Sequence, residues 1–298
     1  MELVSAVIIT YNRPLEILRR AVLSVLHQTY SPMELIVVND CPDNRELSER
    51  IRQMLSQLDS GIVYLVHEKN MGACAARNTG LAAAKGTFIG FLDDDDEWLP
   101  EKTEKQVARM GDGVALVGCD SYRVTGDGIR YHHPTMPCAD PVSAILRTNF
   151  IGSTSFPLLR TACVRAVGGF DVNVKSCQDY DLWIRLIAEY PMAFVGEALV
   201  NYYYSEDSTF KASNQKYLEG SFFLMEKYRQ LYESHPDDYL YKLNSGALTG
   251  LLVKRDLHMY GAYKKAAFRY RPLSRYNFFM LPIKIMGKLK QKAERNHG

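Results

Sequence analysis

The chain has 298 residues, of which 47% are hydrophobic and 23% charged, and its formal net charge is +2. This composition is typical of a soluble globular protein that can bury the core of one large domain or two smaller ones. The six cysteines are scattered without a C-x-x-C pair, which excludes a dense disulfide framework and predicts reduced thiols in a cytosolic protein.

The N-terminal stretch "MELVSAVIITYNR" lacks the basic start of a signal peptide and becomes strand-like at once. No stretch approaches the roughly 20 apolar residues that a membrane-spanning helix needs. The nearest one, "FFMLPIKIMG", is short and is interrupted by Pro282 and Lys284. We therefore expect a cytoplasmic protein, either free or peripheral at the inner face of the membrane.

Four apolar runs in the first hundred residues predict buried parallel strands, because their apolarity is continuous and does not alternate. They cover residues 4–10, 34–40, 61–68 and 87–93. Helical patterns fill the intervals, starting at Pro14, at about Asn44 and at Gly72. Strand and helix alternating at this spacing predict right-handed βαβ units and a doubly wound sheet. In such a sheet, ligands bind beyond the carboxyl ends of the strands.

After Pro100 the pattern becomes mixed, with a strand expected over 113–124 and a helix from about Asp179. From about Asn214 onward only helical patterns follow, with breaks expected at Pro236, near Gly261 and at Pro272. We therefore expect an α/β domain over residues 1–212, in two halves of 1–100 and 101–212, and a helical C-terminal region over 213–298.

The last part of the chain is strongly basic, with 12 Lys and Arg against two acidic residues in 254–298, whereas residues 1–253 carry a net negative charge. A basic tail on an acidic body predicts an anionic partner for the tail. Read as helices, residues 274–293 are amphipathic and suit an interfacial membrane contact more than nucleic acid. A solvated basic helix packed on the body is the alternative.

The stretch "FLDDDDEWLP" gathers Asp93, Asp94, Asp95 and Asp96 at the end of the fourth predicted strand. A solvated acidic loop is one explanation. A site for Mg²⁺ or Mn²⁺ is the other, because these cations prefer oxygen ligands. On a strand-to-loop turn Asp93 and Asp95 can point the same way, while Asp94 and Asp96 diverge. A calcium loop fits poorly, because no glycine follows at the required place and no glutamate closes a twelve-residue loop.

Five segments, in this order and spacing, resemble the family 2 glycosyltransferases over roughly residues 3–205. They are "VSAVIITYNR", "ELIVVND", "NMGACAARNTGLAAAKG", "FLDDDDEWLPEK" and "VGGFDVNVKSCQDYDLWIRL". The resemblance implies the GT-A fold of nucleotide-diphospho-sugar transferases, a Rossmann-like α/β fold with a mixed sheet flanked by helices. It also implies that residues 1–100 bind the nucleotide and residues 101–212 the acceptor.

The resemblance implies a nucleotide pocket at the ends of the first strands, in which Asp40 would hydrogen-bond the nucleobase. The other residues expected there are Thr10, Tyr11, Arg13, Asn70, Arg77, Asp93 and Asp94. Plainer explanations exist for two of them. Asp40 could simply cap the next helix, and Arg77 could form a structural ion pair.

The resemblance also implies a metal site and a general base. Asp93 and Asp95 resemble the outer members of a D-x-D motif whose last aspartate ligates Mn²⁺ or Mg²⁺, although Asp94 leaves the register of the motif open. Asp179, in "QDYDLW", resembles the family's catalytic base, although its place at a helix start equally suits a cap. One base on the face opposite the leaving group implies inversion at the sugar.

The expected function is a metal-dependent inverting glycosyltransferase. It would move a sugar from a nucleotide-diphosphate donor, UDP-sugar by default, to a glycan or lipid-linked acceptor in cell-surface polysaccharide biosynthesis. One alternative is a sugar nucleotidyltransferase, which usually has a glycine-rich loop where "TYNRPLE" has none. The other is a non-catalytic nucleotide or glycan binder.

The sequence departs from the family pattern at three places, and two of them, Gln178 and the segment with Tyr204, leave the non-catalytic alternative open. The sequence has "NDCPDN" where the family has "DDGS", and Gln178 where the family has a glutamate. It has Tyr204 and Glu206 in the segment where many relatives have an arginine or a histidine.

Overall fold

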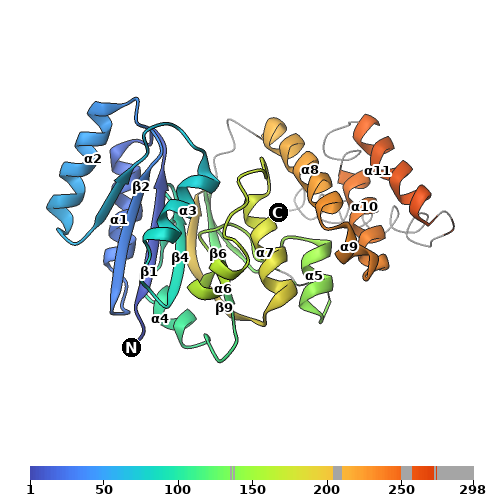
Figure 1. The fold of residues 1–298 in the computed structure, drawn as a ribbon, viewed down its shortest axis with the longest axis horizontal. Coiled ribbons are helices and arrows are strands. Elements are labelled where there is room, and N and C mark those ends of the chain that lie inside the picture. The colour runs from blue at the N-terminus through green and yellow to red at the C-terminus, as the bar shows by residue number, and fades with distance from the viewer. Residues whose placement is uncertain (135, 137, 204–209, 250–256, 272, 274–298) are drawn as a thin grey trace. The chain divides into compact units, whose positions relative to one another are not determined.

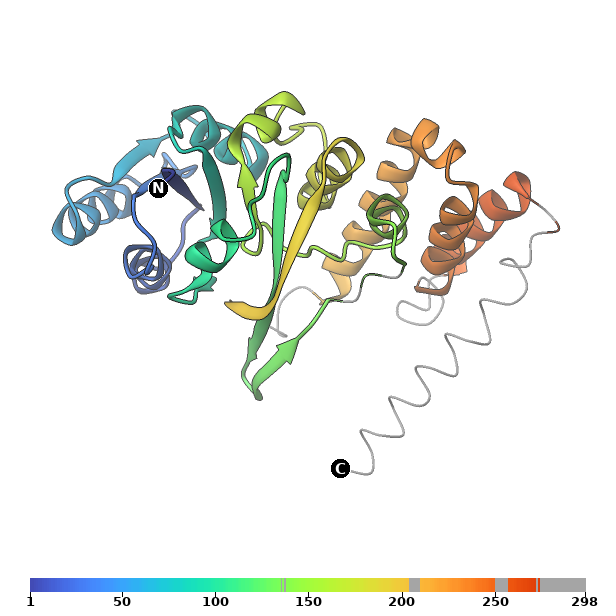
Figure 2. The ribbon, with the colours of Figure 1, turned by 90° about the horizontal axis from the view of Figure 1, so that it is seen from below.

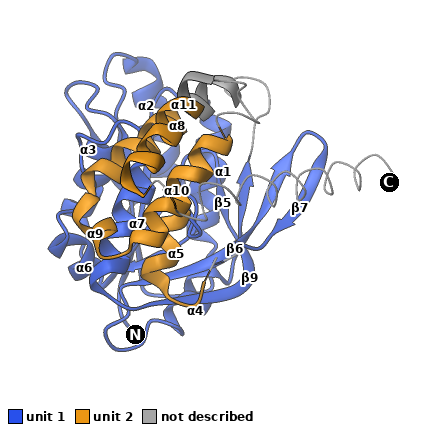
Figure 3. Ribbon diagram, turned by 90° about the vertical axis from the view of Figure 1, so that its right-hand side faces the viewer, with its two compact units in different colours: residues 1–136, 149–208 blue, residues 137–148, 209–298 orange. Residues whose placement is uncertain are grey.

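The computed structural model describes residues 1–134, 136, 138–203, 210–249, 257–271 and 273 (Figure 1). The chain forms two compact units, one of residues 1–136 with 149–208 and one of residues 137–148 with 209–298 (Figure 3). The first unit is built around a sheet, and the second is helical. The expected candidate site residues all lie in the first unit.

The sheet of the first unit has nine strands in the described residues, in the order β3-β2-β1-β4-β8-β6-β9-β5, with β7 paired to β6. The strands are β1 (Val4–Thr10), β2 (Met33–Asn39), β3 (Val63–Val66), β4 (Phe88–Asp93), β5 (Glu97–Trp98), β6 (Leu116–Thr125), β7 (Gly128–His132), β8 (Leu158–Arg160) and β9 (Met192–Tyr203). The first four are mutually parallel, whereas β8 and β5 run antiparallel to their neighbours. The sheet is therefore mixed, and the green hairpin of β6 and β7 extends past the other strands (Figure 2).

The strand ends that the sequence singled out meet at one edge of the sheet. Thr10 is paired with Asn39, and Ile9 with Asp93, so β1, β2 and β4 end side by side. This confirms the expected parallel arrangement of these strands. In sheets of this kind, ligands bind beyond the carboxyl ends of the strands.

Helices cover both faces of this sheet, which explains why every residue of β1 is buried except Ile9, which is partly buried. They are α1 (Leu15–Leu26), α2 (Arg45–Leu58), α3 (Ala73–Ala83), α4 (Lys102–Val107), α6 (Thr161–Ala166) and α7 (Gln178–Glu189). Val4, Ala6 and Ile8 of β1 share a hydrophobic cluster with residues of α1 and α2. On the other face, α3 packs so closely that a Cβ at Gly80 would lie 2.3 Å from a methyl of Val7.

The second unit consists of helices, in agreement with the pattern of the sequence after residue 214. They are α5 (Pro141–Arg147), α8 (Phe210–Lys227), α9 (Arg229–Glu233), α10 (Pro236–Thr249) and α11 (Leu257–Tyr270). The short helix α5 belongs to this unit because Arg147 pairs with Asp238, at 2.5 Å between Nε and Oδ1, and the Tyr232 hydroxyl donates to the Leu146 carbonyl.

The expected break near Gly261 is wrong, because α11 continues through this residue. A single glycine costs a helix only about 1 kcal/mol relative to alanine, and burial of Tyr263 and Ala267 on the same helix offsets that cost. Pro272 and the expected amphipathic segment 274–293 lie outside the described residues. Among the helices of the described ranges, none combines the length and the apolarity needed to cross a bilayer.

Candidate active site

The acidic turn that follows β4 contains four aspartates in two kinds of environment. The side chains of Asp93 and Asp95 are 29% and 41% exposed, whereas Asp94 and Asp96 are buried. The turn is tight, because the Asp96 N–H donates to the Asp93 carbonyl at 3.0 Å. Successive side chains therefore leave it in different directions, and Asp93 and Asp95 are the pair that reaches solvent.

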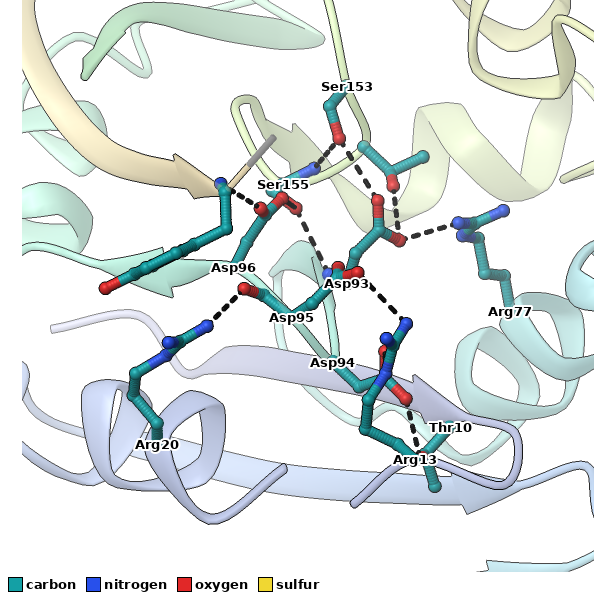
Figure 4. A network of polar contacts seen from close by, with 12 residues as sticks. Thr10, Arg13, Arg20, Arg77, Asp93, Asp94, Asp95, Asp96, Ser153 and Ser155 are labelled. Carbon is teal, nitrogen blue, oxygen red and sulfur yellow. Dashed lines mark hydrogen bonds and ion pairs between the residues drawn. The ribbon is translucent and has the colours of Figure 1, made fainter. Parts of the chain in front are cut away.

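Asp93 is surrounded by donors at the centre of the network in Figure 4. Arg77 donates from Nη2 to its Oδ1 at 2.7 Å, and the hydroxyls of Thr154 and Ser153 donate at 3.0 and 3.1 Å. Burial alone would raise the pKa of Asp93, but the Arg77 guanidinium and the two hydroxyls outweigh it and lower this pKa below its ordinary value. The carboxylate is therefore held in its charged form.

Asp94 and Asp95 share the guanidinium of Arg13, which lies just after β1. Arg13 donates from Nε to Asp94 at 2.8 Å and its Nη2 lies 3.0 Å from Asp95, while Thr10 donates to Asp94 at 2.7 Å. Burial still raises the pKa of both carboxyl groups, and Arg13 opposes the shift. Thr10 and Arg13 thus join the end of β1 to the acidic turn.

Asp96 ties the turn to the rest of the sheet. It accepts from the Ser155 hydroxyl at 2.6 Å and from the backbone N–H of Tyr203, at the end of β9, at 3.1 Å. Burial, together with the charge of Asp93, raises the pKa of Asp96 to about 8. This aspartate is therefore a structural anchor of the turn.

A cavity of about 490 Å³ opens beside Asp93. Its walls include Arg77, Thr154, Lys175, Gln178, Asp179 and Tyr202. Asp179 lies in the first turn of α7, where Asn149 donates from Nδ2 to its Oδ2 at 3.2 Å. Burial raises the pKa of Asp179, and the charge of Asp93 adds to the shift, whereas the Tyr180 N–H and Arg77 oppose it. The cavity thus brings together Asp179 and Asp93, which are far apart in the sequence.

Asp40 lies just beyond β2, and protein donors already surround it. Its Oδ1 accepts from the Met71 N–H at 2.8 Å and contacts His67 Nδ1 at 2.7 Å, and its Oδ2 accepts from the Gly72 N–H at 2.8 Å. The plainer explanation, that Asp40 caps the next helix, does not hold, because Asn44 caps α2 through the Leu47 N–H. Asp40 instead holds the loop that leads into α3.

The other expected nucleotide residues lie along the same edge. Tyr11 follows Thr10 with its side chain 57% exposed, and Asn70 is exposed and accepts from the Gly72 N–H at 3.1 Å. Thr10, Arg13, Arg77 and the aspartates form the connected network of Figure 4, whereas Asp40 and Asn70 meet at the start of α3.

Several residues in these contacts were not singled out from the sequence. They are His67, Asn149, Ser153, Thr154 and Ser155, and also Arg20, which donates to the backbone carbonyl of Asp95. The polar run "STS" (153–155) was an available signal, because polar residues in a connection between a helix and a strand are typical of a loop that carries function. His67, which directly follows β3, was another.

Comparison with known proteins shows to which family the chain belongs. Residues 5–168 match the family model described as "Glycosyl transferase family 2". The chain is 30% identical over 262 residues to WcaA of Escherichia coli K12, which is named for colanic acid biosynthesis, and the match covers 83% of this chain and 90% of WcaA. It is also 30% identical over 187 residues to the E. coli glucosyltransferase WfgD, which covers 63% of this chain and 70% of WfgD.

Among solved structures, the chain is similar to GalNAc-T7 with UDP, GalNAc and Mn²⁺. The TM-score is 0.60 at 16% identity, over 80% of this chain and 51% of GalNAc-T7. This likeness confirms the expected GT-A fold. The sequence matches go further, because one family model spans more than half of the chain and WcaA matches most of it. The chain therefore belongs to glycosyl transferase family 2 and is a glycosyltransferase.

Proposed function

We propose that the protein is a metal-dependent, inverting glycosyltransferase that uses a nucleoside-diphosphate sugar and glycosylates a hydroxyl of a glycan or lipid-linked acceptor in cell-surface polysaccharide biosynthesis. The observation that carries the proposal is one cavity lined both by Asp179 and by the pair of Asp93 and Arg77. The names of two relatives support the setting. WcaA is named for colanic acid biosynthesis, and WfgD for transfer from UDP-Glc to a GlcNAc-diphosphoundecaprenol.

The acidic turn suits a hard divalent cation. Asp93 and Asp95 present partly exposed carboxylates, and we assign Mn²⁺ or Mg²⁺ to them, with Asp95 as the main ligand. The described residues contain no group of three or more His, Cys, Asp or Glu that together could hold a metal. This fits a cation held by one or two carboxylates whose remaining ligands are substrate phosphates and water. Such a cation, when bound, offsets the charge that develops on the departing diphosphate.

We assign the nucleotide to the edge formed by the ends of β1, β2 and β4. Arg13 and Arg77 supply positive charge beside the aspartates, and the exposed ring of Tyr11 offers a flat surface to the base or ribose. Asp40 already accepts from two backbone N–H groups and contacts His67, so a base N–H would use a remaining lone pair of the carboxylate. UDP is the first candidate, since GalNAc-T7 was solved with UDP and Mn²⁺.

Asp179 is the candidate base that removes the proton of the acceptor hydroxyl. Its raised pKa makes it a stronger proton acceptor than an exposed aspartate, and Asn149 fixes one of its oxygens. With the base at one wall of the cavity and the diphosphate held by the turn, the hydroxyl would attack opposite the leaving group. Single displacement with inversion follows from this assignment.

The test replaces Asp179 with Asn, which keeps the size of the side chain and removes its basicity. We expect transfer from UDP-sugars to fall by about 10²–10⁴-fold, which is the usual contribution of a general base, while UDP binding with Mn²⁺ stays within about twofold. Asp112→Asn, at an exposed position of the same unit, is the matched control. Unchanged turnover of the Asp179→Asn protein would remove the base from the proposal.

The family match supports neither of the two alternatives, a sugar nucleotidyltransferase or a non-catalytic binder. We attribute the departures at Gln178 and "NDCPDN" to differences in the acceptor pocket and the nucleobase pocket. Tyr204 and Glu206 lie outside the described residues. We also keep the proposal that the basic segment 274–293 contacts an anionic membrane surface, which would bring a lipid-linked acceptor to the enzyme.

A further inference from the structure

Arg20 contacts the acidic turn from α1, on the side away from Arg77 in Figure 4. Its Nη2 donates to the backbone carbonyl of Asp95 at 2.5 Å. The contact is made to the main chain, so it leaves the Asp95 carboxylate available to other partners. The Arg20 Nε–H is buried and has no hydrogen-bond acceptor within the described residues. Among the described residues, the Arg20 side chain therefore makes one hydrogen bond, and it is with the residue that we assign as the main metal ligand.

The Arg20 guanidinium is also stacked on an aromatic ring. Its Cζ lies 3.5 Å from the centroid of the Tyr203 ring, at the end of β9, which is a close cation–π contact. Tyr203 is itself bonded to the turn at two points. Its N–H donates to Asp96 at 3.1 Å and its hydroxyl donates to Glu97 at 3.2 Å. Arg20, Tyr203 and residues 95–97 thus form a closed ring of contacts.

This ring holds the backbone of the turn at Asp95, Asp96 and Glu97. The side chain of Asp95 is 41% exposed and contacts Arg13, which is itself one-third exposed. Arg20 of α1 bonds the Asp95 carbonyl, and Tyr203 of β9 bonds the next two residues, Asp96 and Glu97. Groups that orient a metal ligand without touching the metal commonly change metal affinity by about 10–100-fold when they are removed.

We propose that Arg20, stacked on Tyr203, is a positioning residue that orients Asp95 for binding of a divalent cation. The inference rests on the proposed function, because it takes Asp95 as the metal ligand. It adds to that function a residue of α1 that has no place in the nucleotide pocket or in the cavity beside Asp179.

The experiment titrates the full chain with Mn²⁺ alone, following free Mn²⁺ by electron paramagnetic resonance. We expect Arg20→Gln to weaken Mn²⁺ binding by about 10–100-fold. Arg20→Lys keeps the charge but loses the planar stacking surface, so we expect a smaller loss. Tyr203→Leu should also weaken Mn²⁺ binding, and the double variant should be little worse than Arg20→Gln, because both substitutions remove the Arg20–Tyr203 stacking contact. Arg19→Gln, the exposed neighbour on α1, is the control and should bind like the wild type.

Sugar transfer provides a second readout. If Arg20 acts by positioning, saturating Mn²⁺ should restore the kcat of Arg20→Gln close to the wild-type value, whereas a general folding defect would not be corrected in this way. Circular dichroism at the assay temperature checks that each variant is folded. If Arg20→Gln is unfolded, Arg20→Lys and Tyr203→Leu carry the test. Mn²⁺ affinity within twofold of the wild type in the folded variants would overturn the inference.

Failure of the proposed function would look different. Wild-type protein that transfers sugar equally well in chelator, or binds no Mn²⁺, would remove the metal assignment itself. If the wild type binds Mn²⁺ and Asp95→Asn abolishes binding, but Arg20→Gln and Tyr203→Leu do not weaken it, only the role of Arg20 is lost.

Discussion

Asp93, Asp94, Asp95 and Asp96 can lie next to one another because each is paired with a donor or a cation, although Asp94 and Asp95 share Arg13. Asp93 accepts from Arg77 and two hydroxyls, Asp94 from Thr10 and Arg13, and Asp96 from Ser155 and a backbone N–H. Asp93, Asp94 and Asp95 each form an ion pair with an arginine, and of these three Asp95 has the most exposed side chain. Three guanidinium groups, from Arg13, Arg20 and Arg77, offset the repulsion between neighbouring carboxylates. The charge of the turn is thus largely balanced before any substrate binds.

Asp179 should give the reaction a pH dependence whose sign follows from its raised pKa. A base must be ionised to accept a proton, so kcat/KM should fall as the pH decreases through that pKa. We expect the midpoint of this fall in kcat/KM, the acidic limb of the profile, to lie above the ordinary aspartate pKa of about 4. Asn149→Ala removes a hydrogen bond that favours the ionised form, so the limb should move to higher pH.

The control for this prediction is Asn173→Ala, which alters an exposed asparagine of the loop before α7 and should leave the profile unchanged. Binding of UDP should be followed over the same pH range, because Asp95 also has a raised pKa and its protonation would weaken the donor site. A kcat/KM limb that coincides with the loss of UDP binding, and does not move in Asn149→Ala, would contradict the assignment to Asp179.

Helix α3 packs on the sheet and places Arg77 beside Asp93 of the acidic turn. It carries Arg77 on its buried side, and it lies against β1 at Gly80, where no side chain would fit. The loop before it is held by Asp40, which accepts from the Met71 and Gly72 N–H groups. The position of Arg77 over Asp93 therefore depends on the close packing of a whole helix on the sheet.

We expect Gly80→Ala to lower the free energy of unfolding by about 1–3 kcal/mol, because the new methyl would overlap the side chain of Val7 and push α3 away from β1. The displaced Arg77 should also weaken UDP binding. Urea denaturation and calorimetric titration with UDP measure the two effects. Gly126→Ala, in the β6–β7 turn with open space around a new Cβ, is the matched control. Stability equal to that of the control protein would show that α3 can shift without cost.

The chain as a whole combines a net acidic part, residues 1–253, with a strongly basic C-terminal segment, residues 254–298. The described helices include none that could cross a bilayer, and residues 274–298 lie outside the described ranges. The proposed membrane contact therefore depends on the sequence pattern of 274–293 alone. Each Lys or Arg near an anionic membrane surface contributes about 1 kcal/mol to binding, so the segment is testable by charge reversal.

We expect the full chain to bind vesicles that contain phosphatidylglycerol and to leave neutral phosphatidylcholine vesicles unbound at physiological salt. Replacing Lys284, Lys288 and Lys290 with Glu should weaken this binding by roughly 100-fold or more, because at least 3 kcal/mol of attraction is removed. Flotation of vesicles with increasing NaCl measures the effect. Lys85→Glu with Arg109→Glu, at exposed positions in the α/β unit, is the control. Equal flotation of the triple variant and the wild type would exclude the segment as the membrane contact.

The parallel half of the sheet was predictable because each of its strands is marked by a short, continuous stretch of the sequence. Continuous apolar runs mark strands buried on both faces, and the observed strands β1, β2, β3 and β4 lie within or close to the four predicted ranges. The acidic turn was predictable as well, since it is one continuous stretch at a strand end. The expected break near Gly261 was wrong because packing of Tyr263 and Ala267 outweighs the weak helix propensity of one glycine.

The amino-acid sequence thus established the fold class, the family resemblance and the residues at the strand ends, because each of these depends on short segments read along the chain. Only the folded chain showed that Ser153 and Thr154 hold Asp93, that His67 contacts Asp40 and that Arg20 stacks on Tyr203. These partners are tens to more than a hundred residues apart, and no periodicity in a sequence records which distant side chains meet. Their contacts arise when strands in a particular order bring the ends of β1, β4 and β9 to the same place.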